Sequence, residues 1–506
     1  MSFTLTEKNP ALCLSTKHTI KWYNTYVKKI VISKLFLYKH RFVIGYVVLG
    51  LIFTALLFSM PIVAQTGLSE AEMESATSSY YLGKTGIMNG DLVDLPYRLL
   101  QKFSIMIFGL TAYAVKLPSI IMGLLLGFLL ILLLNRWFKN NVSLLASCLI
   151  VLSTPFLFLA GWGTPLIMLV FWPTLLLWLG SKIQGEKRPK PMYSFIFVLA
   201  MLLSVFTPYM IYFAVFCVLF VLFQPHLRFI LKNLPKLPLA LVCLILIAGF
   251  TMLGVSTYNH PGTIMELLFA DGFQIGDFFN NIATGLAPVF SWHNTVESVF
   301  LSPLISLPLL ALALIGLFST TKGFFASRNS IATILLVFCL VITGFNPNAV
   351  VFFILPLAIL VAHGLKYLLE KWYGLFPENP YARISALLPL AILFGLMLVP
   401  GSLQYIYGYR YNPNVADEFS YNLEAIRENL TDEYLMPTSN FDFYKILEES
   451  TDLTVTDKVI GDKIAILGKL DKMPENYTLE RIITSPMREN SDIIYVYNHT
   501  ATKEGE

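Results

Sequence analysis

The sequence predicts an all-α polytopic membrane bundle of about eleven transmembrane helices, followed by a small soluble α/β domain. Of the 506 residues, 56% are hydrophobic and only 13% are charged, so too few polar side chains remain to cover a water-facing surface. Apolar segments recur along the first four fifths of the chain, and the composition turns acidic from about Tyr411. These observations exclude a soluble enzyme and give no reason to expect a nucleic-acid partner.

Residues 1–41 form a basic segment in which eight lysines and arginines are interleaved with aromatic residues. A cleavable signal peptide would place its apolar core sooner, so we expect Phe42–Ala64 to be a retained first span. The segment itself is either an amphipathic helix on the cytoplasmic leaflet or an irregular basic tail, and both interpretations stay open.

Ten further apolar segments follow, each near or above the roughly 17 residues that a span requires. Together with the first span they make up a predicted transmembrane domain over residues 42–403. The ten segments are Lys116–Leu134, Val142–Ala160, Pro165–Leu179, Met192–Thr207, Pro208–Phe223, Leu237–Val255, Leu301–Phe318, Ile331–Gly344, Ala349–Tyr367 and Ile384–Pro400.

The distribution of lysine and arginine predicts the orientation. If the amino terminus is cytoplasmic, every predicted inside loop is basic, whereas the outside loop Ser256–Ser298 has no Lys or Arg and Gln65–Tyr97 has only Lys84. Cytoplasmic loops are the basic ones in membrane proteins. We therefore expect a multi-pass protein of the plasma or inner membrane whose C-terminal domain, residues 411–506, is extracytoplasmic.

The five cysteines lie in predicted spans or on the cytoplasmic side, so we expect no extracytoplasmic disulfide. They have no metal-ligand spacing. In the C-terminal domain, Ala416–Asn429 and Phe441–Glu449 are predicted helices. Its predicted strands, rich in β-branched residues, are Asp452–Ile460, Lys463–Leu467, Arg481–Thr484 and Asp492–Tyr497.

The first outer loop, residues 65–115, gathers carboxylates directly after a span. Glu70, Glu72 and Glu74 fall within a turn and a half of a predicted helix, on which Glu70 and Glu74 share one face and Glu72 points elsewhere. Ser69 is a suitable N-cap. Solvated first-turn acids favoured by the helix dipole are the alternative explanation of this cluster.

The apolar stretch Leu99–Leu134 is about twice as long as one span requires, and Gly109–Thr111 interrupts it. We therefore expect an interfacial helix at Leu95–Phe108, a turn, and a span that begins near Lys116 at the outer membrane face. An interfacial helix beside an acidic turn makes a pocket suited to a lipid-linked substrate.

Three motifs occur in order along this region: Ser69-Glu70-Ala71-Glu72, Asp94-Leu95-Pro96-Tyr97, and the run from Phe108 to Ser119, FGLTAYAVKLPS. The ordered set, spread over residues 67–179, resembles the C-type (GT-C) superfamily of multi-spanning glycosyltransferases, which includes protein O-mannosyltransferases and lipid A aminoarabinose transferases. The resemblance implies transfer of a sugar from a polyprenyl-phosphate carrier to a lipid, glycan or protein acceptor.

The same resemblance implies a first-loop carboxylate that acts as base on the acceptor hydroxyl. Glu70 matches the Glu of the family's acidic pair, and Glu72 is the second candidate catalytic residue. The departing phosphate requires cations, and the outward candidates are Lys84, Arg98, Lys102 and Lys116. For Lys116, interfacial snorkelling is the alternative role.

Two departures from the family pattern leave a catalytically degenerate scaffold open. Ser69 stands where the family usually has an Asp, and Leu166 stands where the second outer loop often has one. A lipid-linked sugar transporter is a further alternative, although ionisable residues near the middle of spans, typical of transporters, are nearly absent.

His260, His293 and Tyr209 are candidate substrate-binding residues, with ordinary interfacial positions as the alternative for each. No cofactor is expected. A divalent metal is conceivable chemically, but no ligand motif supports one.

Overall fold

The computed structural model describes residues 36–63, 67–83, 92–185, 191–223, 236–269, 275–290, 304–322, 327–375, 387–411 and most of 419–499. The chain divides into two compact units, Met1–Ile52 and Phe53–Glu506. Most of the predicted basic segment 1–41, together with Lys84 and His293, lies outside the described residues.

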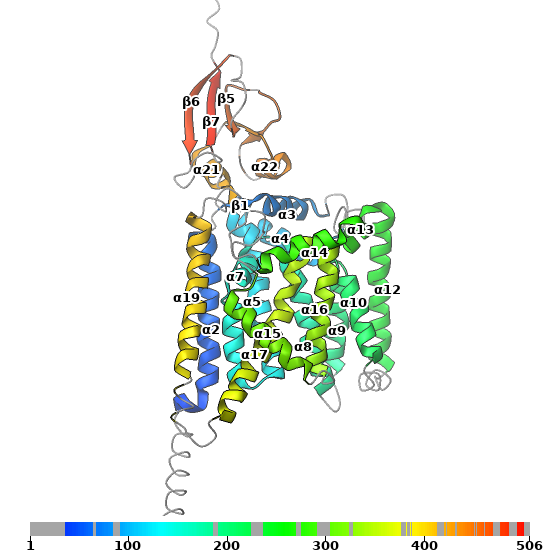
Figure 1. Ribbon diagram of the computed structural model, residues 1–506. Helices are drawn as coiled ribbons and strands as arrows, with labels where there is room; N and C mark the ends of the chain where they lie inside the picture. The colour runs from blue at the N-terminus through cyan, green and yellow to red at the C-terminus, as the bar shows by residue number, and fades with distance from the viewer. Residues whose placement is uncertain are drawn as a thin grey trace, which may run out of the picture. The chain divides into compact units, whose positions relative to one another are not determined.

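Each of the eleven predicted apolar segments coincides with a helix, or with a pair of helices, in the structure (Figure 1). Their apolar composition favours helices because every backbone polar group is then satisfied within the segment. The helices are α2 (Phe36–Val63), α5 (Ala112–Trp137), α6 (Asn140–Val151), α7 (Thr154–Gly161), α8 (Met168–Gly185), α9 (Pro191–Ser204), α10 (Met210–Phe223), α12 (Lys236–Asn259), α15 (Leu307–Thr321), α16 (Ser327–Phe345), α17 (Ile354–Leu375) and α19 (Leu387–Tyr411).

Among the described residues, five helices are long and apolar enough to cross a membrane, and a sixth crossing is formed if α6 and α7, bent by 62°, count as one. Shorter apolar helices lie at Met192–Ser204, Met210–Leu219 and Leu307–Thr321. The helical membrane fold is thus confirmed, while the number of eleven crossings stays a prediction.

Shorter helices connect these elements. The predicted interfacial helix is α4, whose bounds Leu95–Phe108 are those expected from the sequence. The others are α3 (Glu70–Tyr81), α13 (Gly262–Phe269), α14 (Phe278–Phe290) and the 3-10 helices η2 (Pro165–Ile167), η3 (Ile275–Asp277) and η4 (Pro347–Phe353).

The C-terminal domain contains a five-stranded mixed sheet in the order β4-β3-β5-β7-β6. The β3 strand pairs in parallel with β4 and β5, whereas the β5–β7 and β7–β6 pairs are antiparallel. Two helices accompany it, α21 (Asn422–Asn429) and α22 (Phe441–Glu448). The strands are β3 (Tyr434–Pro437), β4 (Thr454–Val455), β5 (Lys463–Leu467), β6 (Tyr477–Thr484) and β7 (Ile493–His499).

The predicted helix Ala416–Asn429 is wrong at Phe419–Ser420. These two residues form strand β2, which pairs antiparallel with β1 (Leu68–Ser69) of the first loop. The pairing partner lies about 350 residues earlier in the chain, so local periodicity carries no sign of it. Strand β3 was not predicted either.

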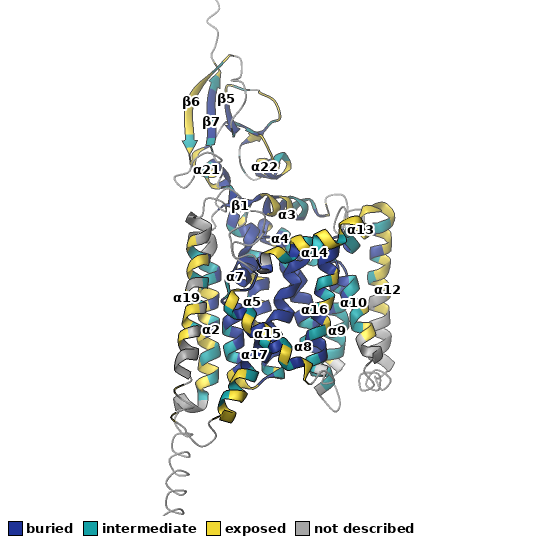
Figure 2. Cartoon of the chain, viewed as in Figure 1, coloured by how far each residue is buried: buried dark blue, intermediate teal, exposed yellow. Residues whose placement is uncertain are grey.

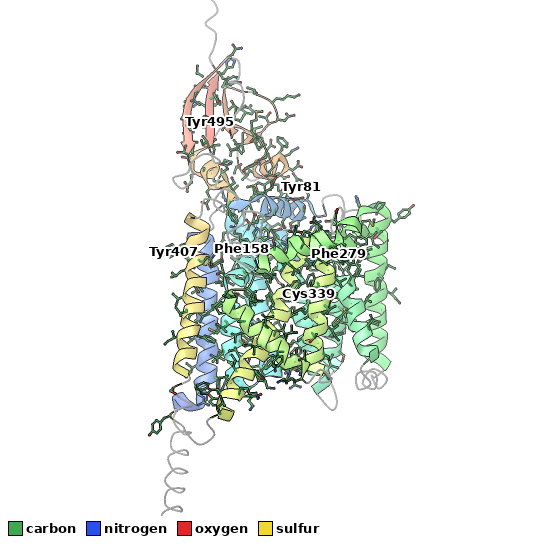
Figure 3. All side chains as sticks on the ribbon, viewed as in Figure 1. Tyr81, Phe158, Phe279, Cys339, Tyr407 and Tyr495 are labelled. Carbon is green, nitrogen blue, oxygen red and sulfur yellow. The ribbon has the colours of Figure 1, made fainter. Side chains whose placement is uncertain are left out.

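Burial is highest in the middle of the helical part of the chain (Figure 2). All eight residues of α7 are buried, and so are the first twelve of α17. Phe158 and Cys339, labelled in Figure 3, lie among these helices, whereas Tyr495 lies in the sheet. The C-terminal domain shares a core with the first loop, built from Leu68, Met73, Ala76, Ile105 and Val115 on one side and Ile426, Leu435, Phe443, Ile446 and Val496 on the other.

Helices α15 and α17 pack backbone to backbone at two glycines. A Cβ on Gly316 would collide with the carbonyl oxygen of Leu360, and one on Gly364 would collide with that of Leu312. Small residues at a helix interface allow this close approach in membranes.

We predict that Gly364→Ala lowers the free energy of unfolding by about 1–3 kcal/mol, because the added methyl group overpacks a close backbone contact. Gly374→Ala is the matched control, since it lies in the same helix with open space around its Cβ. Thermal unfolding of the two variants in the same detergent measures the difference. Equal midpoints would contradict the packing explanation.

Candidate active site in the first loop

Helix α3 begins with a capping box that fixes its first turn. Ser69 is the N-cap; its hydroxyl accepts the backbone N–H of Glu72 at 3.4 Å, and the Glu72 carboxylate accepts the backbone N–H of Ser69 at 2.9 Å. Such reciprocal bonds satisfy two backbone donors that a helix start leaves unpaired. The predicted capping role of Ser69 is confirmed.

The carboxylate of Glu72 is wholly buried and already has several partners. Besides Ser69, its Oε1 accepts the backbone N–H of Gly163 at 2.6 Å. The ammonium of Lys116, also 0% exposed, lies 3.8 Å from the same oxygen. Lys116 donates a further hydrogen bond of 2.7 Å to the carbonyl oxygen of Gly67. The two charges therefore form a buried ion pair, and each of them is hydrogen-bonded to neighbouring backbone groups.

The loop between α7 and η2 closes over this pair. A Cβ on Gly163 would stand 3.0 Å from Glu72 Oε1, so the loop backbone approaches the carboxylate closely and a larger residue would crowd it. The indole N–H of Trp162 donates to the Ser69 hydroxyl at 3.0 Å. Ser69 therefore has a structural role: its contacts hold the start of α3 against the loop.

Gln101 of α4 holds the same loop from the other side. Its amide nitrogen donates to the carbonyl oxygens of Val115 and Gly163, at 3.1 Å each. Its amide oxygen accepts the hydroxyl groups of Ser75 and Ser79 at 2.8 and 2.7 Å. One buried side chain thus joins α3, α4, the start of α5 and the second loop.

The start of α5 replaces a backbone hydrogen bond that proline removes. Pro118 has no N–H to donate to Ala114, four residues earlier, and the Ser104 hydroxyl donates to that carbonyl at 2.6 Å instead. Tyr97 and Ser119 share a hydrogen bond of 2.7 Å, and Ser119 reaches the carbonyl oxygen of Thr164. Complete burial raises the pKa of Tyr97, so its hydroxyl stays neutral.

Helix α4 exposes an apolar face, whereas a surface helix of a water-soluble protein exposes a polar one. Its buried face includes the polar Gln101 and Ser104. Its exposed face is apolar, with Leu99, Leu100, Phe103, Met106, Ile107 and Phe108 each 43–70% exposed. An apolar exposed face of this kind is expected of a helix that contacts lipid.

The two candidate bases therefore lie in different environments. Glu70 and Glu74 are both exposed on α3, as expected for residues that share a face, whereas Glu72 is buried. Glu70 is the carboxylate that a substrate can approach. Glu72 is the one that holds the loop.

The predicted phosphate-binding cations also differ from one another in burial. Lys116 is buried against Gly67 and Glu72 rather than exposed at an outer face. Arg98 and Lys102 are half-buried on α4, and the Lys102 ammonium donates to the carbonyl oxygen of Leu82. Lys84 lies outside the described residues.

The substrate-binding candidates belong to a neighbouring part of the structure. Tyr209 is 3% exposed, has a left-handed backbone with φ 63°, and donates its N–H to Leu267 at 2.9 Å. Leu267 in turn shares a core cluster with Leu95 at the start of α4. His260, just beyond α12, is exposed. His293 is not among the described residues.

Sequence reasoning missed Gln101, Trp162, Gly163 and Phe419. Gln101, on a helix that is mostly apolar, was a visible signal, because a buried amide needs partners. Phe419 gave no signal at all. Its ring lies 5.2 Å from the Lys116 ammonium.

Glu424 adds a second carboxylate near Lys116. Partial burial, and next the charge of Glu428, raise the pKa of Glu424, while Lys116 acts in the opposite direction. Lys116 therefore lies beside the Glu72 carboxylate, the Gly67 carbonyl oxygen and the Phe419 ring, and the charge of Glu424 acts on it as well. Within the described part of the chain, no three His, Cys, Asp or Glu side chains are grouped so as to hold a metal ion.

Comparisons with known proteins agree with this architecture. Residues 96–252 match the family model of dolichyl-phosphate-mannose-protein mannosyltransferases, which covers the chain from α4 into α12. No curated protein matches the sequence.

Solved structures give the fold. ArnT from Cupriavidus metallidurans in the apo state is similar with a TM-score of 0.53 at 14% identity, over 92% of this chain and 100% of that one. The structure of ArnT bound to undecaprenyl phosphate is similar with a TM-score of 0.52 at 12% identity and the same coverage. The Archaeoglobus fulgidus oligosaccharyltransferase tethered with an acceptor peptide is similar with a TM-score of 0.51 at 13% identity, over 83% of this chain and 64% of that one.

At these identities the likeness shows the fold, and the family match adds the sequence relationship over α4–α12. The resemblance noted in the sequence agrees with both findings: the chain has the fold of these solved membrane transferases, and residues 96–252 match the mannosyltransferase family model.

Proposed function

We propose that the protein transfers a sugar from a polyprenyl-phosphate carrier to a hydroxyl-bearing acceptor at the outer face of the plasma or inner membrane. The observation that carries this proposal is the exposed Glu70 carboxylate at the start of a helix that the buried Glu72–Lys116 pair holds in place. The acceptor is a lipid, a glycan or a protein. ArnT was solved with undecaprenyl phosphate, which supports the class of donor.

The reaction requires little covalent chemistry from the protein. Glu70 takes the proton from the acceptor hydroxyl as the oxygen bonds to the anomeric carbon, and the bond from that carbon to the phosphate oxygen breaks. The polyprenyl phosphate leaves with the bonding electrons. Catalysis then rests on a positioned base, oriented substrates and cations for the departing charge.

Glu72 is a poor base in this arrangement. Its two oxygens accept bonds from Ser69 and Gly163 and face Lys116, and the side chain is 0% exposed. We therefore assign Glu70 the chemical role and Glu72 a positioning role.

Among the described residues of this loop, Arg98 and Lys102 are the partly exposed cations, Lys102 with one bond to the Leu82 carbonyl oxygen, and we assign them to the leaving phosphate. Their helix carries the apolar exposed face, which would lie in the bilayer interface beside the carrier's lipid chain. Lys116 is occupied by protein partners and contributes through the position of the loop. We assign contacts with the sugar to His260 and His293. Tyr209 is buried, so we assign it to the wall of the same sugar site.

The alternative is a binding scaffold of the same fold. The observation that favours it is that Ser69 and Leu166 occupy positions where the family often has acids. Ser69 is tied to Trp162 and Glu72, so it performs a structural task.

We predict that Glu70→Gln lowers the transfer rate by about 10²–10⁴-fold, the usual contribution of a general base, without changing the thermal midpoint. Glu74→Gln, one turn along the same exposed face, is the matched control and should retain the rate. The assay measures release of polyprenyl phosphate by mass spectrometry from protein in nanodiscs supplied with a panel of polyprenyl-phosphate sugars. Full activity of Glu70→Gln would remove Glu70 from the mechanism and favour the scaffold.

Glu72→Gln should lower the stability of the protein, which Glu70→Gln should leave unchanged. The amide leaves the buried Lys116 ammonium without its counter-charge, so we expect a loss of about 3–5 kcal/mol in stability. Thermal unfolding of Glu72→Gln beside Glu70→Gln tests this assignment. A normal midpoint combined with lost activity would make Glu72 the base instead.

Arg98→Gln should weaken binding of undecaprenyl phosphate by about tenfold or more, because a charge-assisted bond contributes roughly 1.5–3 kcal/mol. Arg136→Gln is the control, as Arg136 is exposed in the last turn of α5, at the end opposite Lys116. Intrinsic fluorescence titration with undecaprenyl phosphate in detergent measures both. Equal affinities would remove Arg98 from the phosphate site.

A further inference from the structure

The C-terminal domain contacts the first loop at the residues that hold Glu70. Strand β2 pairs with β1 so that Phe419 lies opposite Ser69 and Ser420 opposite Leu68. Ser69 is the N-cap of α3. The helix that carries Glu70 thus begins from a strand pair shared with the C-terminal domain.

Phe419 contacts the buried ion pair as well as the strand. Its side chain is 3% exposed, and the Lys116 ammonium lies 5.2 Å from its ring centroid. A desolvated ammonium over an aromatic face is a favourable contact. The backbones are equally close, because a Cβ on Gly67 would stand 2.9 Å from the carbonyl oxygen of Ser420.

A second set of contacts fixes the far side of the loop. Arg427 of α21 donates to the carbonyl oxygen of Leu110, in the turn between α4 and α5, at 3.3 Å. The Tyr80 hydroxyl donates to Glu449, beside α22. Burial and this bond raise the pKa of Tyr80 to about 12, so the hydroxyl remains a donor well above neutral pH.

Helix α3 depends on these contacts for its own stability. It has twelve residues, and isolated helices shorter than about 12–15 residues are marginal in water. Its buried residues Met73 and Ala76 belong to the same core as Ile426 and Phe443 of the C-terminal domain. The orientation of Glu70 therefore depends on packing that the C-terminal domain supplies.

We infer that the C-terminal domain is a working part of the transferase site, in which Phe419 is a positioning residue that fixes α3, and with it Glu70, through the Lys116 ammonium and the β1–β2 pair. This inference rests on the proposed function for its catalytic consequence. Its structural consequence, the ordering of α3, is independent of any substrate.

The test is hydrogen exchange on the full-length protein in nanodiscs, with three variants. Phe419→Leu keeps an apolar side chain but removes the ring, and Phe419→Tyr keeps the ring. Leu479→Ala, at an exposed position of β6 in the same domain, is the matched control. Exchange is followed in peptides that cover Gly67–Tyr81 and, as an internal reference, β5.

We expect Phe419→Leu to speed exchange in Gly67–Tyr81 by about tenfold, the equivalent of about 1.4 kcal/mol, as for the loss of one desolvated cation–π contact. Exchange in β5 should stay unchanged. Phe419→Tyr should stay within about twofold of the wild type, and Leu479→Ala should not change the loop. Unchanged exchange in the loop, or equal acceleration in β5, would overturn the inference, the latter by making Phe419 a general folding residue.

Activity measurements on the same variants separate the proposed transferase function from the coupling through Phe419. Phe419→Leu should lower kcat for polyprenyl phosphate release by about tenfold with little change in the donor KM, since it misplaces the base rather than the donor. Faster exchange with an unchanged kcat would overturn the catalytic part of the inference. A wild-type protein without transfer would refute the proposed function while leaving the exchange result to decide the coupling.

Discussion

The buried ion pair between Glu72 and Lys116 is the interaction on which the site depends. Two charges removed from water are stable only when the geometry is good and their remaining hydrogen-bonding capacity is satisfied. The charges lie 3.8 Å apart, and their hydrogen-bonding capacity is used, because Ser69 and Gly163 donate to the carboxylate and Gly67 accepts from the ammonium. These partners come from different segments. Breaking the pair would leave an uncompensated charge in the core, so the first loop, the start of α5 and the second loop are held in one arrangement.

In this arrangement, the two carboxylates that lie two residues apart in the sequence have different environments and different roles. Glu72 holds the helix start, and Glu70 stays exposed on a support that cannot easily move. A catalytic group is most effective when its own position is fixed by packing and by a shell of hydrogen bonds. The network around Gln101 supplies that shell from α4, and the same helix has an apolar exposed face, on which the proposed function places the lipid carrier. In the proposed reaction, the base, the cations and the lipid contact thus come from one short stretch of chain.

Much of this could be predicted from the sequence wherever local rules decide the structure. The bounds of α4 and the capping role of Ser69 follow from turn residues, amphipathicity and capping chemistry, all within a few positions. What could not be predicted depends on distant partners. No neighbouring residue in the sequence indicates that Glu72, rather than Glu70, pairs with Lys116, 44 positions later. Nor does any indicate that Glu72 accepts a hydrogen bond from Gly163 in another loop. Phe419 is part of a predicted helix, and only the pairing with β1 makes it a strand. The count of membrane crossings stays open for a related reason, since several helices are shorter than a span requires and composition alone does not decide whether they cross.

An experimental structure of the protein in nanodiscs with undecaprenyl phosphate tests the central claim most directly. We expect a phosphate beside Glu70 and Arg98, with Lys116 still bonded to Gly67 and paired with Glu72. A phosphate bound directly to Lys116 with the Glu72 pair broken, or a head group on another face of the helical domain, would contradict it.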